Sequence, residues 1–150
     1  MQTAKNEMTR RVTYVLETDS IETAYRSMMA LGIRHLPVMR GDKVVGMLSD
    51  RDILQNSYLK NGQRVVEPMK VAQVIRDVVH TCFPDSSIST VAEKMLVHGV
   101  HALPVVTERG KLVGIITSSD LLAILRDADF SRDYVIPFEY ETPKSLSDIL

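Results

Sequence analysis

A repeated stretch of sequence constrains this chain more than any other feature. Residues 44–52, VVGMLSDRD, have a counterpart in residues 112–120, LVGIITSSD. Both contain an apolar pair, a glycine, a second apolar pair, a Ser or Thr, two variable residues and an Asp. We interpret each copy as a buried strand that ends at the hydroxyl residue, where a helix begins.

The repeat extends upstream, because residues 21–38 align without a gap to residues 88–105. In each copy, apolar residues at helical spacing predict an amphipathic helix that ends at a glycine, Gly32 or Gly99. A strand follows, over residues 33–39 and 100–106. Proline lacks a ladder donor, so Pro37 places its strand at a sheet edge or breaks it.

The other predicted strands cover 12–16, 43–48, 81–83 and 111–116, and the other helices 49 to about 58, 71–78 and 117–127. Residues 59–70, which contain Asn61-Gly62, form the connector, and residues 1–11 are a flexible or docked arm. Each half is then β-α-β-β-α. One half is too small to bury both its sheet and its helices, so we predict one α/β (α+β) unit with pseudo-twofold symmetry. Its parts are repeat 1 (8–60), repeat 2 (71–127) and a tail (128–150).

Composition excludes several classes of function. The net charge of −1 gives no attraction to nucleic acid or to acidic membranes, and no apolar run approaches a membrane span. The N-terminus has no apolar signal core, so we expect a cytoplasmic location. Cys82, the only cysteine, is interpreted as a small core residue.

The repeat resembles the CBS domain, and the chain resembles a tandem CBS pair, or Bateman module, from about Met8 to Arg126. Two motifs occur twice: Gly-apolar-apolar-Ser/Thr-x-x-Asp and Gly-Ile/Val-x-x-Leu-Pro-Val. The opening Met8-Thr9-Arg10 and the later Thr81-x-x-Pro84-Asp85 add to the likeness. The resemblance implies clefts between the paired sheets, and a homodimer.

In this family the clefts commonly hold adenosyl ligands such as AMP, ADP, ATP or S-adenosylmethionine. The resemblance gives the ribose hydroxyls to Asp and the phosphates to Ser or Thr. These roles fall on Asp52 with Ser49, and on Asp120 with Thr117. The first copy has Tyr14 where the second has Thr81, and this Tyr either contacts a base or crowds the first cleft. Such a ligand is an effector, and no obligatory cofactor is expected.

The residues themselves leave an alternative open. Ser49-x-x-Asp52 and Thr117-x-x-Asp120 are also capping boxes, in which the hydroxyl and the acid close a helix end. The same acid can accept two hydrogen bonds from a vicinal diol, and a helix N-terminus suits a phosphate. Cations that flank the motifs are candidates for phosphate contacts or ordinary surface charges: Arg34, His35, Arg51 and His101.

No metal site or catalytic set is indicated. His98 and His101 are separated by the helix-ending Gly99, and no Cys or acidic cluster accompanies them. We therefore predict a regulatory, non-enzymatic module that binds an adenosyl ligand and modulates an unknown protein partner. The alternative is a ligand-free dimeric scaffold. The tail of residues 128–150 carries an apolar cluster that either folds back on its own domain or contacts a partner.

Overall fold

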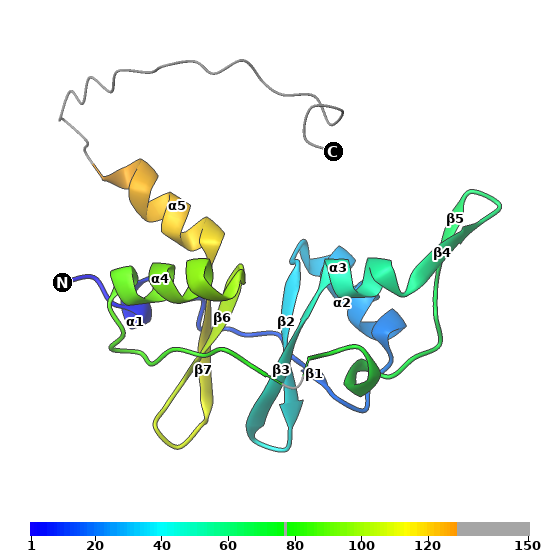
Figure 1. The fold of residues 1–150 in the computed structure, drawn as a ribbon, viewed down its shortest axis with the longest axis horizontal. Helices are drawn as coiled ribbons and strands as arrows, with labels where there is room; N and C mark the ends of the chain where they lie inside the picture. The colour runs from blue at the N-terminus through cyan, green and yellow to red at the C-terminus, as the bar shows by residue number, and fades with distance from the viewer. Residues whose placement is uncertain (77, 129–150) are drawn as a thin grey trace, which may run out of the picture.

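Two similar units of strands and helices make up the protein, as described by a computed structural model over residues 1–76 and 78–128. The two units lie side by side, with their helices toward the same side of the molecule (Figure 1). The first unit consists of β1 (Val15–Leu16), α2 (Ile21–Leu31), β2 (His35–Arg40), β3 (Lys43–Ser49) and α3 (Asp50–Gln55). The second consists of α4 (Ile88–His98), β6 (Ala102–Val106), β7 (Leu112–Thr117) and α5 (Ser118–Asp127).

The helices α2 and α4 begin and end at equivalent residues. Ser20 Oγ accepts a hydrogen bond from the Thr23 amide, and Ser87 Oγ accepts one from the Thr90 amide, both at 3.1 Å. The helices end at Gly32 and Gly99, whose φ angles of 64° and 61° favour glycine. These two helices are confirmed as predicted from the sequence.

The sheets are small. The first has the order β1-β2-β3, with β1 parallel and β3 antiparallel to β2. In the second, β6 and β7 pair antiparallel, and the predicted strand over residues 81–83 is reduced to one parallel bridge between Cys82 and Val105. That strand prediction is wrong in extent, because only Cys82 reaches β6 in hydrogen-bonding position.

The prediction that Pro37 marks an edge or a break is also wrong, since β2 is the central strand of its sheet. In the second repeat, the Cys82 amide donates to the Pro104 carbonyl and the Cys82 carbonyl accepts from the Val106 amide. The pairing therefore uses the carbonyl group of the proline and not its nitrogen, which has no hydrogen to donate. No ladder bond is lost there.

The connector is more ordered than the sequence analysis predicts. Helix α3 ends at Gln55, and β4 (Ser57–Lys60) pairs with β5 (Gln63–Val66) in a hairpin that projects from the first unit (Figure 1). Its turn is Asn61-Gly62, with φ angles of 51° and 76°. An Asn-Gly pair in a two-residue turn is a strong hairpin signal, because both positions require positive φ.

Two further predictions need comment. The helix predicted over residues 71–78 is only the single turn η1 (Val71–Gln73) within the described residues. The predicted tail lies outside the described residues, apart from Ala128. Among the described residues, no helix is both long and apolar enough to cross a membrane.

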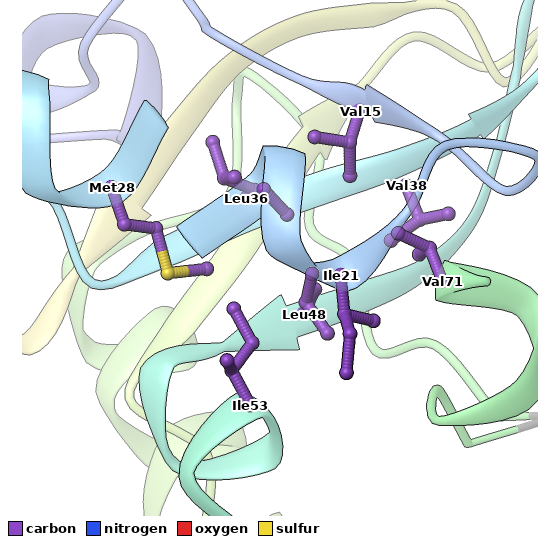
Figure 2. Close-up of a cluster of buried hydrophobic side chains, with 9 residues drawn as sticks. Val15, Ile21, Met28, Leu36, Val38, Leu48, Ile53 and Val71 are labelled. Atoms are coloured by element: carbon purple, nitrogen blue, oxygen red, sulfur yellow. The ribbon is translucent and has the colours of Figure 1, made fainter. Parts of the chain in front are cut away.

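Each unit has its own apolar core. In the first, fully buried side chains from α2, β2, β3 and α3 meet, and Figure 2 shows Ile21, Leu36, Leu48 and Ile53 among them. In the second, the equivalent cluster includes Val91, Leu103 and Ile116. The cores form because the helices and strands each present one apolar face to the other.

Each core also contains a residue from the segment that precedes the other unit. Ala4, in α1 (Ala4–Glu7), is buried in the second core, whereas Val71 is buried in the first. Equivalent backbone bonds fix the two segments: the Ala4 amide donates to the Ser86 carbonyl, and the Val71 amide donates to the Asp19 carbonyl. The arm of residues 1–11 is therefore docked, and the two units exchange arms.

The motif glycines lie where these arms cross the strands. A Cβ atom on Gly46 would lie 2.9 Å from Ile75 Cδ1. A Cβ atom on Gly114 would overlap Met8 Sδ and lie 2.9 Å from Met8 Cγ. The glycine of the repeated motif is thus explained by close packing, because neither position has a positive φ.

Candidate functional site

A cleft of about 840 Å³ lies between the two units and is lined by both. Its walls come from the ends of β3 and β7, the starts of α3 and α5, the turns after α2 and α4, and the segments around residues 11–13 and 78–80. A volume of this size is within the range of small-molecule sites. The two clefts expected from the resemblance are joined in this one cavity.

The cleft brings together all but two of the predicted site residues. Those that line it are Arg34, His35, Ser49, Arg51, Asp52, His101, Thr117 and Asp120. Tyr14 and Thr81 do not line it, although their neighbours Thr13 and His80 do. The side chain of Tyr14 is half-exposed.

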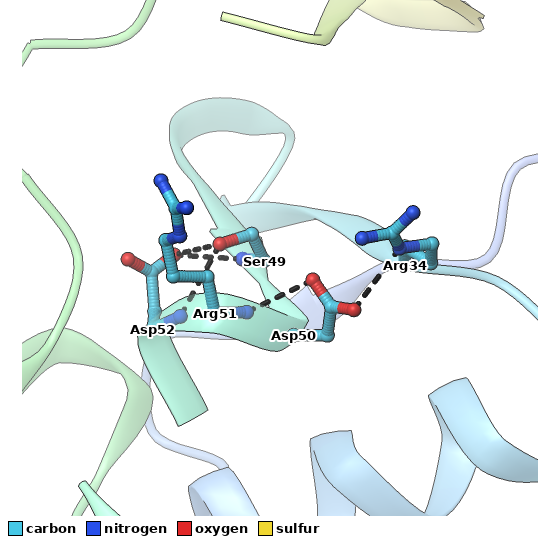
Figure 3. Close-up of polar contacts among 5 residues, drawn as sticks. All are labelled: Arg34, Ser49, Asp50, Arg51 and Asp52. Atoms are coloured by element: carbon cyan, nitrogen blue, oxygen red, sulfur yellow. Dashed lines mark hydrogen bonds and ion pairs between the residues drawn. The ribbon is translucent and has the colours of Figure 1, made fainter. Parts of the chain in front are cut away.

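At the first motif, Asp52 and Ser49 close the start of α3. One carboxylate oxygen, Asp52 Oδ2, accepts from both the Ser49 amide and the Ser49 hydroxyl at 2.8 Å (Figure 3). The hydroxyl oxygen in turn accepts a 3.3 Å bond from the Asp52 amide. This reciprocal arrangement is the capping box that the sequence left open as an alternative.

The second motif has the same geometry. Asp120 Oδ2 accepts from the Thr117 amide at 2.7 Å and from the Thr117 hydroxyl at 2.9 Å. In both motifs the other carboxylate oxygen, Oδ1, has no hydrogen-bond partner among the described residues. Capping therefore uses one oxygen of each Asp and leaves the second without a partner among the described residues.

Strand pairing and two equivalent backbone bonds hold the rim of the cleft. The register places His35 opposite Ser49 and Ala102 opposite Thr117. The Asp50 amide donates to the Arg34 carbonyl at 3.0 Å, and the Ser118 amide donates to the His101 carbonyl at 2.9 Å. These bonds attach the start of α3 and the start of α5 to the turns that precede β2 and β6.

The two halves of the cleft differ in charge. At the first, Arg34 Nε pairs with Asp50 Oδ2 at 3.0 Å, and Arg51 follows directly (Figure 3). At the second, the residues equivalent to Asp50 and Arg51 are the neutral Ser118 and Ser119. The first half therefore carries paired charges, whereas the second offers hydroxyl groups at the start of a ten-residue helix.

His35 is a titratable group whose pKa is changed by this environment. Burial lowers its pKa, and His101 and Arg34 lower it further, while the carboxylates of Asp50 and Asp52 oppose them. A lowered histidine pKa means that the environment of His35 favours the neutral imidazole. An anion bound beside this ring would favour its protonated form instead.

Sequence reasoning missed four residues of the cleft, which lie in the segments that lead into each unit. Arg11 and Thr13 precede β1, Arg76 and His80 precede the Cys82 bridge, and all four line the cleft. No local pattern marks them, because the exchange of arms places them there. His80 also stacks on His98, with ring centroids 3.7 Å apart and planes inclined by 13°.

Cys82 is buried, as expected, and burial raises the pKa of its thiol to about 11. It is therefore a core residue and a poor nucleophile. Among the described residues, no group of three or more His, Cys, Asp or Glu side chains is arranged to hold a metal ion.

A family model of the CBS domain matches residues 4–58 and again residues 71–127. The chain belongs to the CBS domain family. The fold agrees with that of a crystal structure of the CBS domain pair of protein MJ0100 in complex with 5′-methylthioadenosine and S-adenosyl-L-methionine. That match has a TM-score of 0.73 at 24% identity and covers 84% of this chain and 97% of that one.

A second similar structure is that of Hypoxic Response Protein I with two coordinated zinc ions, at a TM-score of 0.67 and 30% identity. The match covers 83% of this chain and 99% of that protein.

Among curated proteins, the homoserine O-acetyltransferase of Methanococcoides burtonii is 36% identical over 115 residues, which are 76% of this chain and 22% of that enzyme. The inosine-5′-monophosphate dehydrogenase of Korarchaeum cryptofilum is 31% identical, and the match covers 96% of this chain and 30% of that enzyme. The CBS pair thus spans less than a third of these curated relatives.

Proposed function

We propose that this CBS pair is a cytoplasmic regulatory module that binds an adenosyl ligand, such as AMP, ADP, ATP or S-adenosylmethionine, in the cleft between its repeats. One observation carries the proposal. Asp52 and Asp120 both line the cleft, and each has one carboxylate oxygen without a hydrogen-bond partner among the described residues. Such an oxygen can accept hydrogen bonds from a ribose diol without breaking the helix cap.

The other cleft residues fit the remaining parts of such a ligand. Apolar side chains that include Ile33, Val79 and Val100 offer walls for an adenine, and Arg34, His35, Arg51 and His101 offer contacts to phosphates. The complex of the MJ0100 CBS pair with two adenosyl compounds supports this ligand class. We keep Tyr14 and Thr81 only as neighbours of the residues that line the cleft.

The regulatory role follows from the position of the cleft. Since both repeats line it, a ligand can contact both and favour one relative arrangement of the two. The effect on a partner protein is limited by the difference in ligand affinity between the two arrangements. The functional unit comprises repeat 1 (8–60) and repeat 2 (71–127), and the docked arm of residues 3–7 extends it.

The test is a ligand screen by thermal shift, followed by calorimetry on each hit, with AMP, ADP, ATP, S-adenosylmethionine and a guanine nucleotide as the control. A ligand at a hundred times its Kd should stabilise the fold by about 2.7 kcal/mol. An adenosyl ligand that shifts the Tm in the wild type but not in Asp120→Ala or Asp52→Ala would support the proposal. Equal shifts with the guanine nucleotide, or none with any adenosyl ligand, would contradict it.

A second candidate is a ligand-free dimeric scaffold. The observation that favours it is a set of large apolar side chains exposed at equivalent positions of the two repeats: Met29 and Leu96, at 67% and 83% exposed, and Leu54 and Leu122, at 43% and 64%. Exposed apolar groups of this kind mark contact surfaces. Homodimerisation is compatible with either function, and only ligand binding separates them.

A further inference from the structure

A pair of histidines joins the wall of the cleft to a helix of the second repeat. His80 lines the cleft, and its ring stacks on that of His98 at a centroid distance of 3.7 Å. His98 is the last residue of α4 and precedes Gly99, which also lines the cleft. The stack therefore connects two parts of the same cavity wall.

A second contact from α4 holds the same segment. Lys94 Nζ donates a hydrogen bond of 2.9 Å to the Thr81 carbonyl, the residue after His80. Lys94 and His98 are four residues apart on α4, so both lie on the face that meets this segment. Residues 78–81 are thus attached to α4 by one stacked ring pair and one hydrogen bond.

The protonation state of the two rings affects the stack, because a second proton places like charges face to face. Two imidazolium rings at this distance repel each other, and Lys94 adds a third positive charge. Burial, His98 and Lys94 all lower the pKa of His80. On the cleft side, the same cavity is lined by charged groups of both signs: Arg11, Arg34, Asp50, Arg51, Asp52, Arg76 and Asp120.

We propose that the His80–His98 stack positions the cleft wall at residues 78–80, and that uptake of a second proton by the pair releases the wall and lowers ligand affinity. The second half of this inference rests on the proposed adenosyl function. The positioning role of the stack concerns the ligand-free protein alone. An experiment can therefore refute the positioning role and the effect on ligand affinity independently.

The direction of the pH effect follows from the geometry. Near neutral pH the pair carries at most one proton and the wall is held. As the pH falls below the ordinary histidine pKa of about 6.5, the pair takes up a second proton, and both stacked rings are then charged. The wall is therefore held at neutral pH and released in acid.

The first experiment follows the wall without any ligand. Imidazole and amide NMR signals of His80, His98 and Val79 are recorded between about pH 5 and pH 8 in the wild type and in His98→Phe, which keeps a stacking ring without a charge. We expect the pKa of His80 to be higher in His98→Phe, and the Val79 amide to shift with pH in the wild type only. Identical titration of His80 and Val79 in both proteins would overturn the positioning role.

The second experiment measures the Kd of AMP by calorimetry at about pH 7.5 and pH 5.5. All other groups of the cleft are the same in both proteins, so the difference between the wild type and His98→Phe isolates the pair. We expect the wild type to lose up to about tenfold more affinity in acid than His98→Phe, the factor for one unit of pKa shift on binding. Equal losses would overturn the link to affinity. Failure of AMP to bind either protein at neutral pH would count against the proposed function for that nucleotide, while the NMR titration still decides the positioning role.

Discussion

At the scale of single residues, Asp52 and Asp120 each serve two roles through two oxygens. The Oδ2 atom closes a capping box, and the Oδ1 atom faces no partner among the described residues. The two roles can be separated by a change of Asp to Asn. The amide oxygen of Asn can still accept the hydrogen bonds of the cap, but the negative charge and the second acceptor oxygen are lost. The choice of substitution therefore decides which role is tested.

We expect Asp120→Asn to keep most of the cap and to weaken adenosyl binding. A hydrogen bond to a charged group contributes about 1.5–3 kcal/mol, so the Kd should rise about ten- to a hundredfold. Asp120→Ala should show the same loss of affinity and also lose about 1 kcal/mol of unfolding free energy with the cap. Calorimetry and Tm on both variants, with Asp52→Asn and Asp52→Ala as the matched pair, check this. Unchanged affinity in both Asn variants would leave capping as the only role.

Stability should fall in mild acid. The pKa values of His35 and His80 are both lowered in the folded protein. A lowered histidine pKa means that folding favours the neutral ring, so this contribution is complete above the unfolded pKa of about 6.5 and is lost as the pH falls below it. We expect the Tm to decline from pH 7 toward pH 5. The His35→Phe variant should decline less, and an equal decline would exclude His35 as a source.

At the scale of elements, the arm that precedes each repeat packs over the motif glycine of the other. We expect Gly114→Ala to cost about 1–3 kcal/mol of unfolding free energy, because the new methyl group overlaps Met8 and the docked arm must shift. Gly46→Ala is the matched control and should cost less, since its new methyl group would lie 2.9 Å from Ile75 Cδ1 instead of overlapping its neighbour. Denaturant unfolding measures both, and a Gly114→Ala protein as stable as the wild type would refute the packing explanation.

The sequence predicted the elements whose signals are local. The serine caps and glycine stops bounded α2 and α4 correctly, and the duplicated motif located β3, β7 and the starts of α3 and α5. The hairpin was missed although Asn61-Gly62 signals it, because the residues after α3 were assigned to a longer helix and a connector. The prediction for Pro37 failed because the width of the sheet beside it depends on tertiary structure.

The residues of the candidate site that could be predicted were likewise those marked by a local sequence signal. Residues inside the repeated motif and its partner strand were found, because the repeat marks them. Arg11, Thr13, Arg76 and His80 were not, because they reach the cleft through arms that cross from one repeat to the other. Tyr14 and Thr81 lie next to residues that line the cleft but do not line it themselves, because alignment of the repeats fixes a position along the chain but not the direction of its side chain.

At the scale of the whole molecule, equivalent apolar side chains on the helices predict self-association. We expect Leu96→Glu to convert a dimer into a monomer without unfolding it, because the side chain is 83% exposed in the single chain. Light scattering after gel filtration measures the mass. Leu59→Glu, on the hairpin and 65% exposed, is the matched control and should leave the dimer intact. A wild-type monomer at micromolar concentration would contradict the prediction.

The exchange of arms has a consequence for any attempt to divide the protein. A cut at the Asn61-Gly62 turn would leave one fragment that carries Ala4 and another that carries Val71, each a piece of the other's core. Neither fragment could complete its interior alone, but the two together could, so they should reassemble when mixed. The hairpin is thus a suitable site at which to split the protein into two fragments. The affinity of the two fragments for each other would then measure how strongly the two units are held together.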